Sequence, residues 1–421
     1  MPMATEDPVF PETFRVAIVG GGIGGLAVAL SLNTYCPELA NITVYEQAPE
    51  YGEIGAGVGI GIQAARVLKK LGVFEAANGI SGERNGCHRS TRRYDNDGVI
   101  VDVSAASSNG LHDGVGQLWV HRAEFLEVLY SEIRKRGSAR LETNKRAVAL
   151  EDRGSTVSIT FEDGSTASAH LVIACDGIHS TLRNQFAVDR PTYSGRIAYR
   201  GTLPFAGTEL AASWPYPSLT VSWLAPDKHF LVFPISQNRL LNVVGFVTKP
   251  ESELGGLKES WKSSAPREDL EQEYEGWTEN VQKIIHSMSP EVSKWKLNDR
   301  ELLSNWCYMG GKVVLSGDAA HAMLPHQGTC ASRGLARITL CPLSGSKLVW
   351  IAHLPPRLWG RPFHRRCQRA RTRDKRLPSQ PRLRSVCVHQ VLPGRAPATG
   401  AEGADHVEAS GRCIRVPGSR L

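Results

Sequence analysis

Three glycines and one glutamate near the start of the chain have the spacing of a dinucleotide-binding turn. Gly20, Gly22 and Gly25 form the pattern G-x-G-x-x-G, and Glu46 follows 21 residues after Gly25. The first glycine allows a tight turn, the second lets the backbone approach a pyrophosphate, and the third lets a helix pack closely on a strand. An acid at this distance binds ribose hydroxyls. The pattern predicts a site for NAD, NADP or FAD without choosing among them.

The elements that position these residues can be predicted from the flanking sequence. Residues 16–19 form a short apolar run, which is typical of a strand buried on both faces. Residues 26–32 continue as a helix whose N-terminal N–H groups and dipole favour phosphates, and residues 42–45 predict a second strand that ends at Glu46. The alternative is a glycine-rich turn without a ligand. The strand, the helix and the acid at the expected distance favour the dinucleotide site.

The rest of the chain alternates helical and strand-like segments. Helices are expected over 64–71 and from 121, and strands over 99–103, 156–161, 169–175 and 313–316. Several apolar runs between 192 and 248 predict a sheet domain inserted into the nucleotide-binding domain. Residues 251–300 are interpreted as polar and helical, with Trp261, Trp277 and Trp295 as packing anchors.

Charge is distributed unevenly along the 421 residues. Residues 330–421 hold 18 basic and 4 acidic side chains, a net charge of +14, whereas residues 1–329 hold 31 basic and 38 acidic ones, a net charge of −7. The overall charge of +7 therefore does not indicate nucleic-acid binding. No apolar run is long enough to span a membrane, and the polar, acidic residues 1–14 are not a signal peptide. We expect a cytoplasmic protein. The nine cysteines show no metal-ligand spacing, so no metal site is predicted.

Three fingerprints follow one another in a characteristic order. They are the glycine-rich turn with Glu46, Cys-Asp-Gly-Ile-His-Ser at 175–180, and Gly-Asp-Ala-Ala-His-Ala-Met-Leu-Pro at 317–325. With them, residues 14 to about 335 resemble the FAD-dependent aromatic-ring monooxygenases of the p-hydroxybenzoate hydroxylase type, in particular the salicylate hydroxylase-like branch. The resemblance implies an α/β fold, with a Rossmann-type FAD-binding domain (1–79, 118–190 and 301–335) and an inserted β-sheet substrate domain (80–117 and 191–300).

The resemblance also implies which residues contact the cofactor. Gly20, Gly22, Gly25 and Glu46 would hold the ADP half of FAD, while the loop from Ala56 to Gly59 and the residue Arg122 would line the cofactor. Asp176 and Gly177 would serve the pyrophosphate and a transient NADPH or NADH. Asp318 would meet the ribityl and pyrophosphate region, and the backbone near Ala331 would approach the flavin ring.

The implied reaction consumes NAD(P)H and O₂ and hydroxylates an electron-rich ring in a site closed to water. A ring reacts faster as phenolate, so a base near its hydroxyl helps. His229 resembles the position of that base in some family members, and its alternative role is that of a surface histidine in a turn. Arg200 would steer a substrate carboxylate or orient the flavin, and its alternative is a structural ion pair. We expect His321 to pack near the cofactor without proton transfer, and Gln327 is a further candidate for the substrate pocket.

The resemblance ends shortly after the third fingerprint. The family pattern requires a second glycine at position 330 and an acidic pair at 336–337, where this chain has Cys330 and Ala336-Arg337. Residues 336–421 form an Arg- and Pro-rich tail with no sustained periodicity. Codons for Ala336-Arg337-Ile338 can encode Glu-Asp in another frame, so our hypothesis is that the tail is translated out of frame. The rival interpretation is a genuine disordered basic tail.

These observations predict an FAD-dependent monooxygenase that hydroxylates a phenolic or polyketide-derived aromatic substrate, in secondary metabolism or aromatic catabolism. One alternative is a catalytically impaired or dead relative, owing to the altered C-terminus. A second alternative is a flavoprotein that oxidises without oxygenating. The expected partners are a small aromatic substrate and O₂. The position of hydroxylation and the oligomeric state are left open.

Overall fold

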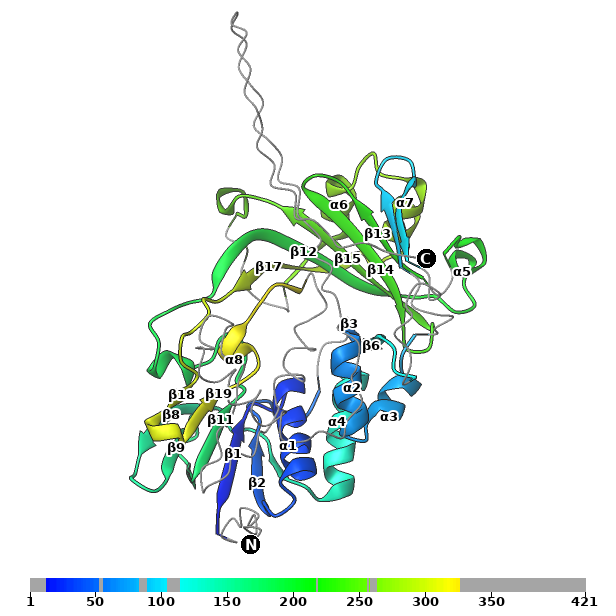
Figure 1. Cartoon of the computed structure of the whole chain (residues 1–421). Helices are drawn as coiled ribbons and strands as arrows, with labels where there is room; N and C mark the ends of the chain where they lie inside the picture. The colour runs from blue at the N-terminus through cyan, green and yellow to red at the C-terminus, as the bar shows by residue number, and fades with distance from the viewer. Residues whose placement is uncertain are drawn as a thin grey trace, which may run out of the picture. The chain divides into compact units, whose positions relative to one another are not determined.

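The computed structural model describes residues 13–52, 56–82, 89–103, 114–216, 219–255, 257 and 263–325 (Figure 1). Two large sheets dominate this part of the chain, one of six strands and one of eight. A three-stranded sheet and a two-stranded ribbon accompany them. The fold is therefore of the mixed α/β class that the sequence predicted.

The six-stranded sheet has the strand order β18-β19-β11-β1-β2-β7. All neighbouring strands are parallel except β18, which pairs antiparallel with β19. Its strands are β1 (Arg15–Val19), β2 (Asn41–Tyr45), β7 (Arg140–Glu142), β11 (Leu171–Ala174), β18 (Cys307–Tyr308) and β19 (Val313–Leu315). Four helices share an apolar cluster with it: α1 (Ile23–Tyr35), α2 (Ile62–Lys70), α3 (Phe74–Gly79) and α4 (Arg122–Arg136). None of the described helices combines the length and apolar character that a bilayer crossing requires.

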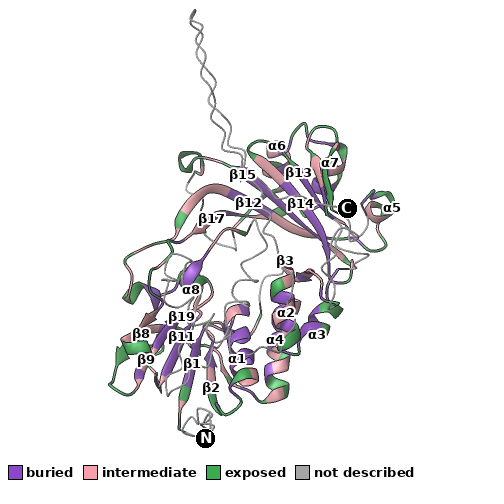
Figure 2. Cartoon of the chain, viewed as in Figure 1, coloured by how far each residue is buried: buried purple, intermediate pink, exposed green. Residues whose placement is uncertain are grey.

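Strand β1 is buried on both faces, as its apolar run predicted. Val16 and Ile18 belong to the cluster that contains helix α1, whereas Ala17 and Val19 belong to a second cluster. The second cluster includes the three-stranded antiparallel sheet β8 (Ala147–Asp152), β9 (Val157–Phe161) and β10 (Thr166–Ala169). Successive side chains of a strand point to opposite faces, so each residue of β1 meets one of these two layers. Figure 2 shows buried residues along the strands of this sheet.

The eight-stranded sheet has the order β16-β17-β12-β15-β14-β13-β4-β5. Its strands are β4 (Arg89–Arg93), β5 (Val99–Val103), β12 (Thr192–Pro204), β13 (Thr220–Leu224), β14 (Lys228–Ile235), β15 (Leu240–Thr248), β16 (Ser264–Pro266) and β17 (Glu291–Asp299). Helices α6 (Arg267–Glu273) and α7 (Glu279–His286) cover one face, where Leu270 and Ile284 pack with strand residues such as Tyr199 and Phe230 (Figure 1). The short helix α5 (Glu209–Ser213) borders the same apolar cluster.

The interpretation of residues 251–300 as helical was wrong for residues 264–266 and 291–299, which are strands. Residues 291–299 form strand β17, which pairs with β12 on one side and β16 on the other. This pairing overrides the polar composition because Lys294 and Lys296 find acidic partners in Asp269 and Glu251. Trp277 is buried near α7, as an anchor should be, but Trp295 is buried from a strand and not from a helix. Trp261 lies outside the described residues.

A two-stranded antiparallel ribbon, β3 (Gly57–Ile60) with β6 (Leu118–His121), connects the two large sheets through side-chain contacts. The Trp119 ring of β6 lies 4.4 Å from the Phe233 ring of β14, centroid to centroid. The Gly57 N–H donates a hydrogen bond of 2.7 Å to Oδ1 of Asn242 on β15. The ribbon therefore rests on the middle strands of the eight-stranded sheet.

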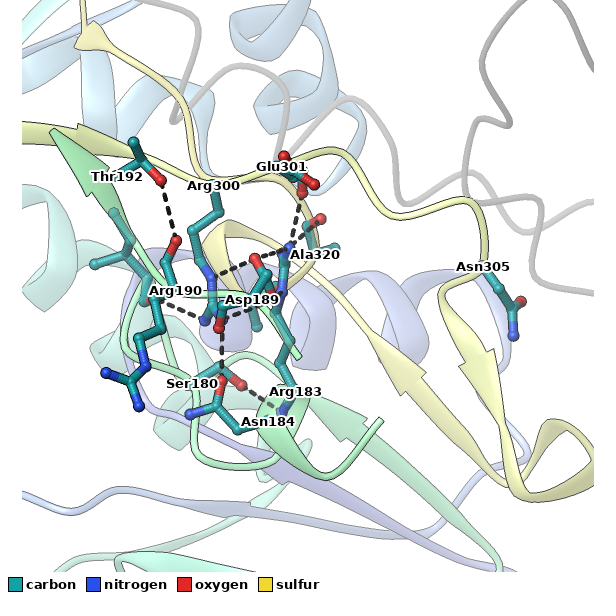
Figure 3. Close-up of polar contacts among 12 residues, drawn as sticks. Ser180, Arg183, Asn184, Asp189, Arg190, Thr192, Arg300, Glu301, Asn305 and Ala320 are labelled. Atoms are coloured by element: carbon teal, nitrogen blue, oxygen red, sulfur yellow. Dashed lines mark hydrogen bonds and ion pairs between the residues drawn. The ribbon is translucent and has the colours of Figure 1, made fainter. Parts of the chain in front are cut away.

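A buried ion cluster joins several loops at the edge of the six-stranded sheet (Figure 3). The Asp189 carboxylate accepts two hydrogen bonds from Arg183, at 3.0 and 2.6 Å, and two from Arg300, at 3.0 and 2.9 Å. The side chains of Arg183 and Arg300 are 0% and 1% exposed. We call these three residues the Asp189 clamp.

The remaining guanidinium donors of the Asp189 clamp reach backbone carbonyls in three other segments. Arg183 Nη1 donates to the carbonyls of Ala319 and Ala320 in helix α8 (Asp318–His321), at 3.0 and 3.2 Å, and Nη2 donates to Glu301 at 2.7 Å (Figure 3). Arg300 Nη1 donates to the carbonyl of Ile178 at 3.0 Å. The clamp therefore fixes the segment after β11, the segment after β17 and the third fingerprint against one another.

Replacing Asp189 would leave two buried guanidinium groups without their carboxylate. We expect Asp189→Asn to lower the free energy of unfolding by about 3–5 kcal/mol, because removal of one partner leaves buried charge uncompensated. Burial by itself would raise the pKa of Asp189, but Arg183 and Arg300 outweigh it and hold that pKa below its ordinary value. The clamp is therefore intact above about pH 4 and weakens as the pH falls further. Chemical denaturation across this pH range measures the difference between the two proteins.

The matched control is Glu151→Gln, which breaks an ion pair with Arg153 in which both side chains are more than half exposed. Exposed pairs contribute little, so this variant should unfold like the wild type. An Asp189→Asn protein as stable as the Glu151→Gln protein would show that the clamp is not a determinant of the fold.

Candidate active site

The predicted cofactor residues gather at one edge of the six-stranded sheet. Gly20 follows β1, Glu46 follows β2, Asp176 is the second residue after β11, and Asp318 comes three residues after β19. These four strands are parallel, so their carboxyl ends meet at the same edge. Ligands of open α/β sheets bind outside this edge. The fold therefore brings together residues that are almost 300 positions apart in the sequence.

The glycines of the first motif are required for different reasons. Gly20 has φ of +107°, and a Cβ there would lie 2.3 Å from the carbonyl oxygen of Cys175. A Cβ on Gly25 would lie 1.9 Å from the carbonyl oxygen of Gly20, so only glycine lets helix α1 start this close to the turn. Gly22 precedes α1 and has no atom within 4 Å of its hypothetical Cβ. Its surroundings leave the start of helix α1 open to an anion.

Glu46 lies directly against the glycine-rich turn. Its Oε2 accepts a hydrogen bond of 2.6 Å from the Gly21 N–H, and its Oε1 accepts one of 2.8 Å from the Ala48 N–H. These bonds fix the carboxylate after β2. Each carboxylate oxygen has a further lone pair, so Glu46 can still accept hydrogen bonds from two ribose hydroxyls.

Asp176 and Gly177 form the turn after β11. The Asp176 carboxylate accepts hydrogen bonds from the Ser180 hydroxyl, at 2.5 Å, and from the Leu182 N–H, at 3.1 Å. Burial raises the pKa of Asp176, and these hydrogen bonds oppose that effect in part. Gly177 has φ of +81°, which favours glycine. Asp176 thus holds its own loop, and that loop lies beside the Gly20 turn.

The glycine-rich ribbon and the third fingerprint complete the same edge. The Arg122 N–H, at the start of helix α4, donates to the carbonyl of Ala56 at 2.8 Å. A Cβ on Gly59 would lie 2.6 Å from the Trp119 ring. Asp318 is exposed to water, and the protein atoms around it raise its pKa. The positive charge of Arg122 acts on Asp318 in the opposite direction, so the two predicted residues are near each other.

The donor set fits the diphosphate and ribose of a dinucleotide. The open helix start at Gly22 suits phosphate, the carboxylate of Glu46 suits ribose hydroxyls, and the loop beginning at Ala56 presents little side-chain bulk. Ala331 and Gln327, which were also predicted near the flavin and substrate, lie outside the described residues. Among the described ranges, no cluster of three or more His, Cys, Asp or Glu side chains is arranged to hold a metal ion.

The two predicted catalytic residues share one face of the eight-stranded sheet. In the antiparallel register, His229 lies opposite Phe246, which lies opposite Ala198, and Arg200 lies opposite Val244. Directly paired residues point to the same face, and so do residues two apart on one strand. This face also carries Trp295, opposite Ala198, so we call it the Trp295 face. It is the face that helices α6 and α7 do not cover.

Aromatic neighbours hold both side chains on the Trp295 face. The His229 ring stacks on the Phe246 ring at 4.3 Å and 19°. The Arg200 guanidinium lies 5.4 Å from the centroid of the Trp295 ring. Leu324, the leucine of the third fingerprint, packs against the apolar cluster of this face. The Trp295 face therefore meets the end of the segment that begins at Asp318.

His321 is buried in helix α8, with its ring 5.3 Å from that of Trp306.

Sequence reasoning missed two features altogether. It missed the Asp189 clamp, because a buried arginine and an exposed one look alike in a sequence, and it missed the bond between Asn242 and Gly57. The only signal for the clamp was that Arg183 follows the second fingerprint by three residues.

Comparison with known proteins agrees with this geometry. Residues 13–332 match the family described as FAD binding domain. The chain is 34% identical over 341 residues to a salicylate hydroxylase of Pseudomonas putida, covering 76% of this chain and 74% of the relative. It is 30% identical over 325 residues to a 6-hydroxynicotinate 3-monooxygenase of Pseudomonas fluorescens, covering 76% and 80%.

A solved salicylate hydroxylase substrate complex has the same fold, with a TM-score of 0.63 and 29% identity over 77% of each chain. The expected Rossmann-type FAD-binding fold and the expected cofactor FAD are thereby confirmed. The chain is an oxidoreductase and belongs to the family of FAD-dependent aromatic-ring monooxygenases.

Proposed function

We propose that the chain hydroxylates a phenolic ring that carries an anionic substituent, using NAD(P)H and O₂. The observation that carries the proposal is the Trp295 face, which presents a basic and an imidazole side chain among aromatic rings, Arg200 and His229. The names of the two bacterial relatives specify salicylate and 6-hydroxynicotinate, and each of these rings bears a hydroxyl and a carboxylate. Both groups find a complementary side chain on this face.

When bound, FAD would take two electrons from NAD(P)H and activate O₂, of which one oxygen atom goes to the ring and the other to water. The chain's own residues orient and activate the substrate. Arg200 pairs with the carboxylate, because a guanidinium matches its two oxygens. His229 accepts the proton of the phenol and makes the ring more electron-rich. The two side chains lie two strands apart, about 10 Å across the sheet, so they suit a ring whose hydroxyl and carboxylate stand opposite each other, as in 6-hydroxynicotinate, better than the adjacent groups of salicylate.

The neighbours of these two residues keep water out. Phe246 and Trp295 are buried on the same face, and Leu324 adds an apolar side chain from the third fingerprint. Exclusion of water protects the activated oxygen from wasteful loss as H₂O₂. We infer a division of labour between an FAD-binding domain (1–79, 118–190, 301–335) and a substrate domain (80–117, 191–300), in a cytoplasmic enzyme.

The visible absorption spectrum tests the cofactor site first. We expect the purified protein to show bound oxidised flavin, either directly or after addition of FAD. Glu46→Gln should weaken FAD binding about tenfold to a hundredfold, because a hydrogen bond to a charged group contributes about 1.5–3 kcal/mol. Titration followed by flavin fluorescence measures both dissociation constants.

Glu50→Gln is the control, since Glu50 is an exposed acid four residues further along the same loop. It should bind FAD like the wild type. A protein that stays colourless with FAD would support the alternative of an impaired relative with an altered C-terminus. Flavin turnover that yields H₂O₂ with every phenolic acid and no hydroxylated product would support the oxidase alternative.

His229→Gln tests the proposed base. We expect kcat to fall by about 10²–10⁴-fold, which is the usual contribution of a positioned base. An imidazole must be neutral to accept a proton, so wild-type activity falls as the pH is lowered. The variant should lack this acid limb in its profile of kcat/KM against pH, while its FAD spectrum stays normal.

His286→Gln replaces an exposed histidine at the end of α7, on the covered side of the sheet, and should keep both the rate and the acid limb. If His229→Gln keeps the acid limb and the wild-type rate, His229 is not the base.

A further inference from the structure

The side-chain amide of Asn242 is buried, and only its oxygen has a hydrogen-bond partner among the described residues. It lies on β15, is 0% exposed, and shares the Trp295 face because it pairs with Thr202 and Phe233. Its Oδ1 accepts the 2.7 Å hydrogen bond from Gly57 of the ribbon. Only the oxygen of an amide accepts a hydrogen bond, so this contact fixes the orientation of the side chain. Its Nδ2 is buried and has no hydrogen-bond partner among the described residues.

The ribbon fits closely at this point. A Cβ on Gly57 would lie 2.5 Å from the Phe233 ring and 2.6 Å from Cγ of Asn242. The Phe233 ring in turn meets Trp119, which packs on Gly59. The backbone of the ribbon therefore lies directly on the sheet, in close contact with the side chains of Phe233 and Asn242.

An amide at this position gives little net stability. The bond to Gly57 is favourable, but the buried Nδ2 donor without a partner costs a comparable amount. An apolar side chain of the same shape would remove the unpaired donor while leaving the Gly57 N–H unpaired, so it exchanges one unfavourable group for another. An apolar side chain accepts no hydrogen bond from Gly57, so it cannot fix the position of the ribbon. The fold gains a defined position of the ribbon from Asn242, not stability.

We propose that Asn242 is a positioning residue that holds the cofactor-facing ribbon against the substrate-binding sheet and thereby sets the affinity for FAD. The proposal rests on the proposed role of the loop from Ala56 to Gly59 as a lining of the cofactor. Gly57 lies within that loop, and Arg122 bonds its first residue from the other side. Asn242 thus links the face that would hold the substrate to the loop that would touch the flavin.

Amide hydrogen exchange at Gly57 tests the bond itself. Asn242→Leu should speed exchange at Gly57 by about tenfold or more, because the N–H loses its acceptor. Its melting temperature should stay near that of the wild type, since the change removes one unpaired group as it creates another. Asn242→Asp places a carboxyl group where burial favours the neutral form, and this form keeps an oxygen acceptor at the same place, so slow exchange should be restored. Peptide-resolved mass spectrometry over residues 56–61 gives this measurement without any cofactor.

Affinity for FAD tests the consequence. Asn242→Leu should bind FAD about tenfold more weakly, and Asn242→Asp should bind it like the wild type. The matched control is Gln237→Asn, which removes another hydrogen bond between the same sheet and the α-helical layer, from Gln237 Nε2 to the carbonyl of Gly79 at 2.6 Å. Asn tolerates the positive φ of +57° at this position, so the backbone is not strained. This control should leave both exchange at 56–61 and FAD affinity unchanged.

Two results would overturn the inference: slow exchange at Gly57 in Asn242→Leu, or an unchanged FAD affinity despite fast exchange. An equal loss of affinity in Gln237→Asn would also overturn it, because any contact between the layers would then suffice. A wild-type chain that takes up no FAD would contradict the proposed function instead. In that case the exchange comparison still decides whether Asn242 holds the ribbon.

Discussion

The carboxylate of Asp189, enclosed by two buried guanidinium groups, is the constraint on which the cofactor edge depends. The segment after β11, the segment after β17 and the short helix α8 meet there. Burying two positive charges is unfavourable unless every donor is satisfied. Because the donors of Arg183 and Arg300 reach the carboxylate and four backbone carbonyls outside it, among other acceptors, the loops can occupy only one arrangement.

This arrangement has a direct consequence for the site. A parallel sheet brings its carboxyl ends to one edge, but it does not specify where the loops beyond those ends lie. The glycines at 20 and 25 fix the first loop by excluding side chains, and Glu46 ties the second loop to the first. The Asp189 clamp fixes the loops after β11 and β19. Each loop is thus fixed by a different means. The glycines exclude side chains from the first loop, Glu46 bonds the second loop to the first, and the Asp189 clamp holds the loops after β11 and β19.

The sequence allowed the first half of this arrangement to be predicted, and physical reasons explain why the rest escaped. The glycine motif and Glu46 are local: their function follows from strand, turn and helix within about 30 residues. The bond between Gly57 and Asn242 joins positions 185 residues apart, and no periodicity reports such a contact. Strand β17 was mistaken for a helical segment because its lysines are neutralised by acids elsewhere in the fold. Arg200 and His229 were predicted as catalytic residues only through the family resemblance, and that role stays a prediction. Their shared face follows from the strand register, which the sequence alone does not specify.

The order of these contacts along the chain bears on the altered C-terminus. Every residue of the Asp189 clamp, of the ribbon and of the Trp295 face precedes Cys330, where the sequence first departs from the family pattern. Among the described residues, which end at Pro325 in this region, the clamp's last acceptor is Ala320 and the last apolar contact to the Trp295 face is Leu324. The family match likewise ends at residue 332. The described part of the scaffold that positions the FAD edge therefore lies within the range that matches the family, before the sequence departs from its pattern. The altered sequence after Cys330 would therefore affect the contacts that these residues make with the flavin. For this reason the flavin content of the purified protein, and not its folding alone, distinguishes an active enzyme from an impaired one.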